Sequence, residues 1–236
     1  MCFFVAQFAK LSQLRTRYWN SVLKDTDAFK ESYVSSAFAH PNLLILSEVD
    51  NAPTLHLAKW GLIPSWVKDA QDAEEISNAT LNARGETIFE KPSFFQSVRH
   101  SRCIIPANGF YEWQHIGDKK QPYYISLNDQ EIFSLGGLYS VWSDTVTGTK
   151  AETFSIITVE ANPLMREIHN TKFRMPLIIF PEHEKEWIST TTASAQIHSL
   201  IAPYSDTTMQ AWQINSFNPN NPNANNPNLI KPSTLF

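Results

Sequence analysis

The second residue of the chain is a cysteine. In "MCFFVAQFAK" Cys2 follows Met1 directly, and a cysteine is small enough to permit removal of the methionine before it. The exposed residue would carry an α-amine with a pKa of about 7.7–8.0 and a thiol with a pKa of about 8.5, both partly nucleophilic near neutral pH. The thiol could attack an acyl carbon with the amine as base, or the amine could condense with an aldehyde and the thiol close a thiazolidine. Position alone favours a simpler interpretation, a small apolar thiol without a role.

Two polar side chains in "LNARGET" (81–87) form a second candidate. Asn82 and Arg84 alternate, so on an extended strand they share one face. An amide and a guanidinium together suit an oxyanion or a phosphate. Taken alone, the same residues fit a strand end with a surface arginine.

Glu112 is a candidate for proton transfer. In "ANGFYEW" (107–113) a strand would direct Phe110 and Glu112 to one face and Tyr111 and Trp113 to the other. Burial among aromatic side chains would raise the pKa of the carboxyl and suit it to act as a general acid. The alternative is a carboxylate that faces solvent on a one-sided antiparallel strand.

His169, in "EIHNTKFRMP" (167–176), is a second candidate, because the ordinary histidine pKa suits proton transfer at neutral pH. A lone histidine is more often structural. His100, His169 and His183 lack the spacing to cysteine that a zinc site needs. Phosphate-loop, HExxH and GxSxG motifs are absent from the sequence. We therefore expect no metal and no cofactor.

The elements that must position these residues follow from apolar periodicity. Residues 11–30 carry Leu11, Leu14, Tyr18 and Val22 at helical spacing and predict an amphipathic helix. The polar, acidic residues 68–77 predict a solvated loop. Helical turns are expected in 162–170 and from 181, and short strands in 42–50, 54–66, 102–106, 109–114, 122–127, 132–142, 153–159 and 175–181.

Hairpin-like spacing of these strands, with helices near both ends, predicts an α+β protein. The 236 residues, 42% of them hydrophobic, can bury a sizeable core. A net charge of −4 does not indicate a nucleic-acid binder, although a local basic face remains compatible with it. Two cysteines and no apolar stretch of membrane-spanning length lead us to expect a cytoplasmic protein with no membrane association.

Six segments of the chain, in order from Cys2 to about Pro232, resemble the SRAP family, the SOS-response-associated or abasic-site-processing proteins. The segments are "MC", "WGLIPSW", "NARGET", "RCIIPANGFYEW", "KKQPYYI" and "IHNTKFRMP". The resemblance implies one domain over 1–236 with a curved, largely antiparallel sheet, a barrel-like core and flanking helices. It also implies that the Asn/Pro-rich segment 216–236 docks on the domain, although its composition alone favours disorder.

The resemblance further implies a DNA-damage protein that binds abasic sites in single-stranded DNA and links to them through a thiazolidine at Cys2, with lyase and peptidase activities also associated with the family. A monomer suffices for such a reaction. By matching position, Cys2 is the nucleophile, Asn82 orients the sugar and the terminus, Glu112 is the acid/base and His169 assists ring opening. The expected DNA contacts are Arg84, Trp66, Lys91, Lys172 and Arg174.

Two alternatives stay open at this point. One is an N-terminal-nucleophile cysteine peptidase or amidohydrolase, which would use Cys2 on an acyl group and need an oxyanion hole. The other is a non-catalytic single-stranded DNA-binding module in which Cys2 is idle. The chain also departs from the common Met-Cys-Gly-Arg start of the family, since Phe3 and Phe4 follow Cys2. The departure removes a cation and the backbone freedom of a glycine from the terminus.

Overall fold

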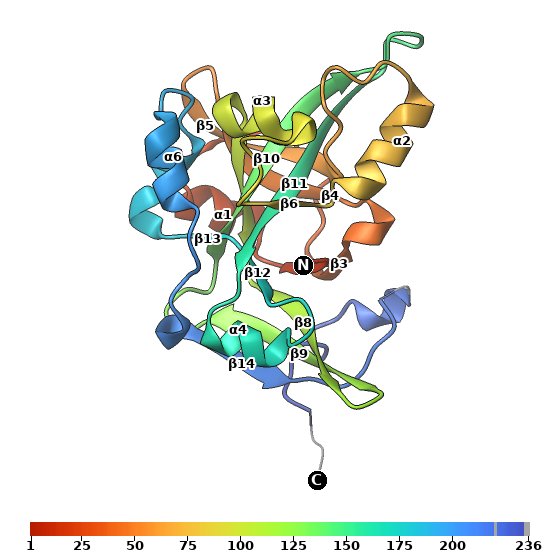
Figure 1. The fold of residues 1–236 in the computed structure, drawn as a ribbon, viewed down its shortest axis with the longest axis vertical. Helices are drawn as coiled ribbons and strands as arrows, with labels where there is room; N and C mark the ends of the chain where they lie inside the picture. The colour runs from red at the N-terminus through yellow and green to blue at the C-terminus, as the bar shows by residue number, and fades with distance from the viewer. Residues whose placement is uncertain (220, 234–236) are drawn as a thin grey trace.

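The computed structural model describes residues 1–219 and 221–233. Within them the strands form one sheet of nine and one of five, with helices placed around the sheets (Figure 1). The chain passes from the larger sheet to the smaller where Asn108 separates β7 (Arg102–Ala107) from β8 (Gly109–Ile116). The predicted α+β class is confirmed.

The larger sheet curves until it closes on itself. Its strand order is β12-β11-β10-β7-β4-β5-β2, and β11 also pairs with β5 in parallel, with Phe154 opposite Trp60. Five strands therefore form a closed ring, which confirms the expected barrel-like core. The strands of this sheet not yet given are β2 (Val22–Lys24), β4 (Asn42–Val49), β5 (Ala52–Trp60), β6 (Asn82–Arg84), β10 (Phe133–Ser143), β11 (Lys150–Glu160), β12 (Arg174–Pro176) and β13 (Ile178–Ile179).

The smaller sheet holds the N-terminal strand in its interior. Its order is β14-β9-β8-β1-β3, all antiparallel, with β1 (Phe4–Gln7) between β8 and β3 (Ser32–Ser36). The two remaining strands are β9 (Lys119–Leu127) and β14 (Met209–Gln213). Pairing on both sides of β1 fixes where the first residues of the chain lie.

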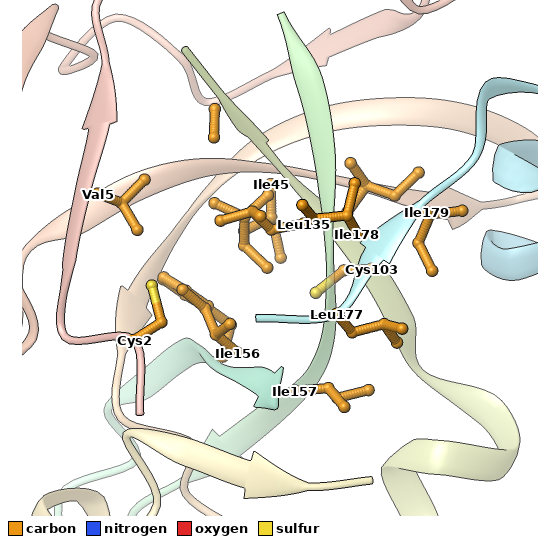
Figure 2. Close-up of a cluster of buried hydrophobic side chains, with 14 of the residues drawn as sticks. Cys2, Val5, Ile45, Cys103, Leu135, Ile156, Ile157, Leu177, Ile178 and Ile179 are labelled. Atoms are coloured by element: carbon orange, nitrogen blue, oxygen red, sulfur yellow. The ribbon is translucent and has the colours of Figure 1, made fainter. Parts of the chain in front are cut away.

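One large apolar cluster fills the closed ring and reaches the N-terminus. Figure 2 shows Cys2 and Val5 in this cluster together with Cys103 and Ile156, and all four are fully buried. The apolar, β-branched strands supply these side chains because strands of a closed ring turn alternate residues inward. The interpretation of Cys103 as a core residue is confirmed.

Two predictions of local structure are wrong. The helix expected over 11–30 ends early and is limited to α1 (Leu11–Arg17), because Trp19 and Asn20 take left-handed backbone angles and β2 then pairs with β5. The loop expected over 68–77 is α2 (Ala70–Ala79). Its acidic start favours a helix, since the Asp69 side chain accepts a hydrogen bond from the backbone N–H of Asp72.

The remaining helices agree with the sequence signals. Proline stands in the first turn of α3 (Pro92–His100) and of α4 (Pro163–Ile168), and Asn162 caps α4 through a 2.8 Å bond from the Met165 N–H. The predicted helix from 181 is η2 (Pro181–His183) followed by α5 (Glu184–Ile188). The others are η1 (Ala37–Ala39), α6 (Ser194–Leu200), η3 (Asp206–Thr208) and η4 (Pro222–Ala224). No described helix is long and apolar enough to cross a membrane.

The Asn/Pro-rich segment contacts the smaller sheet along its described residues. Trp212 donates a 2.8 Å hydrogen bond from Nε1 to the Ile230 carbonyl, and the Ser233 N–H donates to the Gln213 carbonyl. Leu229 and Ile230 pack against the apolar cluster of this sheet. Residues 220 and 234–236 of the segment lie outside the described part of the chain.

Candidate active site at the N-terminus

The α-amine of the chain lies between the two predicted proton-transfer residues. The Met1 nitrogen is 3.2 Å from Nδ1 and 3.4 Å from Nε2 of His169, and 3.7 Å from Oε1 of Glu112. Met1 is more than a hundred positions from each of the two residues in sequence, and the fold brings all three together. An amine, a carboxyl and an imidazole in contact can exchange protons during an addition to a carbonyl group.

Strand pairing explains why Glu112 lies beside the terminus. β1 runs antiparallel to β8 with Val5 opposite Phe110, so extending this register places Glu112 next to the residues just before β1. The predicted alternation holds, because Phe110 belongs to the main core and Tyr111 and Trp113 belong to the cluster on the other face. Glu112 therefore shares the inward face with an aromatic core residue.

The Glu112 carboxyl is held in its neutral form near pH 7. It is buried, and desolvation raises its pKa to about 8, against the opposing pull of the terminal ammonium. Its Oε1 accepts no hydrogen bond from any described residue. A buried carboxyl with an unpaired oxygen is able to donate a proton to a bound substrate.

His169 has the opposite preference. It is the C-cap residue of α4, and burial together with the nearby terminal ammonium lowers its pKa to about 4. Its Nδ1 lies 2.9 Å from the Arg174 carbonyl oxygen, so Nδ1 carries the proton when the ring is neutral. Nε2 is then the basic atom, and a neutral imidazole beside a neutral carboxyl forms a base and acid pair at pH 7.

Asn82 fixes the backbone of the terminus. β6 pairs in parallel with β11, with Asn82 opposite Ile156, and its Nδ2 donates a 3.0 Å hydrogen bond to the Cys2 carbonyl. The Oδ1 atom of the same amide is buried and has no hydrogen-bond partner among the described residues. The amide thus holds the terminus with one atom and leaves an acceptor for a ligand.

The Cys2 thiol points into the core and not into solvent (Figure 2). Burial and the nearby Glu112 raise the pKa of the thiol well above its usual value. Its nearest polar partner is the Phe4 carbonyl oxygen, 4.0 Å away. In the chain that carries Met1, the amine therefore faces the pocket and the thiol is a protected, protonated group.

A pocket of about 510 Å³ opens beside the amine. Glu112 is the only acidic residue among the described residues that line it, and the raised pKa leaves this carboxyl largely uncharged at pH 7. Lys120 and Lys172 supply positive charge. The other lining residues are Met1, Phe3, Phe4, Trp113, His115, His169, Thr171, Phe217 and Pro219.

The predicted DNA-contact residues are spread over the surface. Lys172 lines the pocket, and the exposed Arg84 ends β6, two residues from Asn82. Lys91 is exposed at the start of α3. Trp66 is 53% exposed but borders a different cavity, with Gln96, His100 and Tyr139 among its neighbours.

Arg174 differs from the expectation for a DNA contact. Its side chain is only 10% exposed, and its guanidinium donates to both carboxylate oxygens of Glu86 and, at 2.5 Å, to the Thr158 carbonyl. The backbone carbonyl of Arg174 accepts a hydrogen bond from Nδ1 of the His169 ring. Most donors of the guanidinium are therefore used within the protein, and the contact with His169 is made by the backbone of Arg174 and not by its side chain.

Three residues in or beside the pocket, Asn170, His115 and Lys120, were not among the predicted site residues. Asn170 exchanges two hydrogen bonds with the backbone of His115, which ties the residues after His169 to β8. The partners are separated by 55 positions. Asn170 and Lys120 lie in the family segments "IHNTKFRMP" and "KKQPYYI", which could have marked them, whereas His115 lies in none of these segments.

The fold and this site define a class of protein, an α+β protein whose N-terminal amine lies beside a buried carboxyl and a buried imidazole. A model of the family "SOS response associated peptidase (SRAP)" matches residues 1–217, and the chain belongs to this family.

Relatives and solved structures agree with this assignment. The chain is 41% identical to "Abasic site processing protein YoaM" of Bacillus subtilis over 81% of its length and 84% of the relative. It is 31% identical to "Abasic site processing protein HMCES" of Xenopus tropicalis over 70% of its length and 55% of that relative. A crystal structure of a protein from Bacteroides thetaiotaomicron superposes with a TM-score of 0.90 at 38% identity, covering 98% of this chain and all of that one.

Proposed function

We propose that this protein binds abasic sites in single-stranded DNA and links to them covalently through Cys2 after Met1 is removed. Family membership and the names of the relatives support the substrate class. The observation that carries the proposal is the placement of the terminal amine within 3.2 Å of His169 and 3.7 Å of Glu112, at the wall of an open pocket. Hydrolysis of the Met1–Cys2 peptide bond frees the amine of Cys2, one residue along the chain from the nitrogen that these distances describe.

The proposed reaction joins one aldehyde to one aminothiol. The abasic sugar opens from its hemiacetal to expose the C1′ aldehyde, and the amine of Cys2 adds to that carbon. The resulting carbinolamine loses its hydroxyl as water and becomes an imine. The thiol then adds to the imine carbon, its proton passes to the nitrogen, and a thiazolidine closes. The net change is two new bonds to C1′ and the release of one water.

His169 and Glu112 divide the proton transfers between them. The neutral His169 accepts a proton from the sugar hydroxyl or the adding amine, because its lowered pKa keeps it unprotonated at pH 7. The neutral Glu112 donates to the departing hydroxyl, because burial keeps it protonated. Burial lowers the pKa of the Met1 amine at this site, and we propose that the same surroundings favour the nucleophilic, uncharged form of the Cys2 amine after processing.

The buried thiol implies an order of events. In the Met1-bearing chain the Met1 amine faces the pocket, and the Cys2 thiol lies in the core with its pKa raised. We therefore place the attack of the freed Cys2 amine before that of its thiol. Rotation of the side chain after imine formation brings the sulfur to the carbon. The Asn82 bond to the Cys2 carbonyl holds the backbone during this rotation.

Binding of the strand is proposed for residues around the pocket. Lys172 and Arg84 pair with phosphates, and Lys91 adds to the positive field further along the surface. Trp66 offers an exposed ring on which a more distant base can stack. The Arg174 side chain is proposed to stabilise this region through Glu86 and Thr158, while its backbone carbonyl contacts the His169 ring.

Strand cleavage is proposed as a side reaction of the same imine. The imine acidifies the neighbouring C2′–H, and loss of that proton expels the 3′ phosphate by β-elimination. Ring closure by the thiol removes the imine and competes with this step. Cys2→Ser keeps the amine and is expected to convert the protein from crosslinking to slow cleavage. Peptidase activity, limited to release of Met1, is a further proposal for the same terminus.

Intact-mass measurement on abasic single-stranded DNA tests the proposal. Protein lacking Met1 is expected to gain the mass of the DNA less one water, and the product is expected to withstand heat. Cys2→Ala, with an amine but no thiol, is the matched control and forms at most a reversible imine. Absence of an adduct with fully processed protein would overturn the proposal. Hydrolysis of amides without a DNA adduct would instead support the N-terminal-nucleophile peptidase.

A further inference from the structure

A continuous row of aromatic rings runs from the reactive terminus along the pocket. Phe38 contacts Phe3 with ring centroids 4.8 Å apart and Phe4 at 6.2 Å, and Phe4 meets Trp113 at 4.9 Å. Trp113 continues to Phe217 at 6.0 Å. Four of these residues line the pocket, and Phe38, which is not among the lining residues, contacts both Phe3 and Phe4.

Phe38 is the most solvent-exposed ring of the row. It is 61% exposed, although a phenylalanine normally buries its ring. It belongs to η1, which the fold attaches to the reactive terminus, because the Ala37 N–H donates a 2.8 Å hydrogen bond to the Phe3 carbonyl. The exposed Phe38 ring therefore has a fixed place beside Phe3, the residue that follows Cys2.

The chemistry around the row favours a nucleic-acid strand as its occupant. Lys120 and Lys172 line the same pocket, and the buried Glu112 is largely uncharged there at neutral pH. Aromatic faces beside cations are the combination that binds bases and phosphates of single strands. A purely apolar partner would leave the two lysines without a counter-charge.

We propose that the exposed Phe38 ring, supported by Phe3 and Phe4, stacks on the unpaired base next to the abasic sugar and so adds affinity for strands that carry a base there. The inference rests on the proposed function, since the amine site fixes the position of the sugar. An abasic sugar has no base of its own to bind. The adjacent base is consequently the nearest flat surface that the row can hold.

Stacking on this row also accounts for the two residues after Cys2. Phe3 and Phe4 support Phe38 at ring distances typical of aromatic pairs. Stacking adds affinity that does not depend on counterion release. Base stacking at the terminus therefore contributes a salt-independent part of the affinity for single-stranded DNA, and the lysines of the pocket contribute the salt-dependent part.

Affinity for two unreactive oligonucleotides tests the inference. Both carry a tetrahydrofuran abasic analogue, which has no aldehyde. In the first oligonucleotide the nucleotides on each side of the analogue are adenines, and in the second they are abasic spacers. Wild-type protein is expected to bind the adenine-flanked strand about tenfold more tightly, by fluorescence anisotropy. Phe38→Ala is expected to lose most of this preference and to bind the spacer-flanked strand as the wild type does.

Two variants control for fold and for aromatic character. Phe180→Ala removes another exposed phenylalanine, which stacks on Tyr204 away from the pocket, and is expected to leave the preference unchanged. Phe38→Trp is expected to preserve it. Equal wild-type affinity for the two strands, or an equal loss on both in Phe38→Ala, would overturn the inference.

Failure of the inference can be told apart from failure of the proposed function. Adduct formation with an aldehyde-bearing strand reports on Cys2, whereas the tetrahydrofuran strands report on binding alone. An adduct without a flanking-base preference rejects only the role of Phe38. A preference without any adduct supports base stacking and rejects the covalent reaction.

Discussion

The amide of Asn82 donates a 3.0 Å hydrogen bond to the carbonyl of Cys2, joining β6 to the residue that carries the proposed chemistry. The contact connects the closed ring of the larger sheet to the N-terminus, because Asn82 pairs through β6 with β11. The bond holds the backbone of Cys2 and does not involve its side chain. The bond therefore fixes the amine and permits the rotation that the thiol needs.

Loss of this bond is expected to slow adduct formation without unfolding the protein. Asn82→Ala removes both the donor to Cys2 and the unpaired acceptor Oδ1, and small displacements of reacting groups are costly. We expect a rate lower by about 10- to 100-fold in single-turnover assays, and a stability loss of about 1 kcal/mol. Asn82→Asp, of nearly equal size, is the control for volume. Wild-type rates in both variants would contradict the positioning role.

The rate of adduct formation is expected to depend on both proton-transfer residues. It rises as His169 loses its proton above about pH 4 and falls as Glu112 ionises above about pH 8. Initial rates across this range measure the profile. Glu112→Gln is expected to slow the reaction by about 10²- to 10⁴-fold and to remove the alkaline decline. A Glu112→Gln profile that still declines above pH 8 would assign that limb to another group.

Glu112 is also expected to make stability depend on pH. Its folded pKa of about 8 lies above the ordinary value of 4.5, so its contribution is greatest below about pH 4.5 and is lost as pH rises to about 8. Glu112→Gln removes this loss. Urea unfolding of the Met1-bearing chain is expected to show the variant gaining about 1 kcal/mol on the wild type per pH unit between pH 5 and 8. A constant difference across this range would show that Glu112 is ionised in the folded protein.

Both thiols are expected to resist modification in the native Met1-bearing chain. Cys2 and Cys103 are fully buried, and burial raises the pKa of each. Labelling with a disulfide reagent is expected to be at least about tenfold slower than in urea, since the thiolate is the reactive form. Cys103→Ala isolates the signal of Cys2. Rapid native labelling of that variant would mean that the thiol faces the pocket before any substrate binds.

Lys172 and Arg174 are expected to separate binding from structure. Lys172→Ala is expected to weaken binding of single-stranded DNA and to reduce the slope of log affinity against log salt by about 0.7.

Arg174→Met is expected to cost about 1–3 kcal/mol of stability, because it breaks a mostly buried pair with the half-exposed Glu86. Adding Glu86→Gln is expected to recover part of that loss. An unchanged stability in Arg174→Met with a reduced salt slope would restore its interpretation as a DNA contact.

Sequence patterns were reliable where local chemistry decides structure. The alternation in "GFYEW" correctly placed Glu112 on the same face as Phe110, although it left open whether that face is buried, and the strand containing Asn82 and Arg84 has the predicted form. Local patterns failed where tertiary pairing decided the result. Residues 22–24 could continue a helix by periodicity, but they pair with β5, and the acidic start of α2 is a helix cap that composition presented as a loop.

The sequence by itself determined the parts of the site: a cysteine at position 2, an amide, a carboxyl and an imidazole within motifs of one family. Only the tertiary structure decided their states. Burial raises the pKa of Glu112 and lowers that of His169, and it directs the Cys2 thiol inward. The tertiary structure also places Arg174 in an ion pair with Glu86 and brings Phe38 into contact with Phe3 and Phe4. Proton affinity and exposure depend on neighbours distant in sequence, which chain pairing and packing bring together.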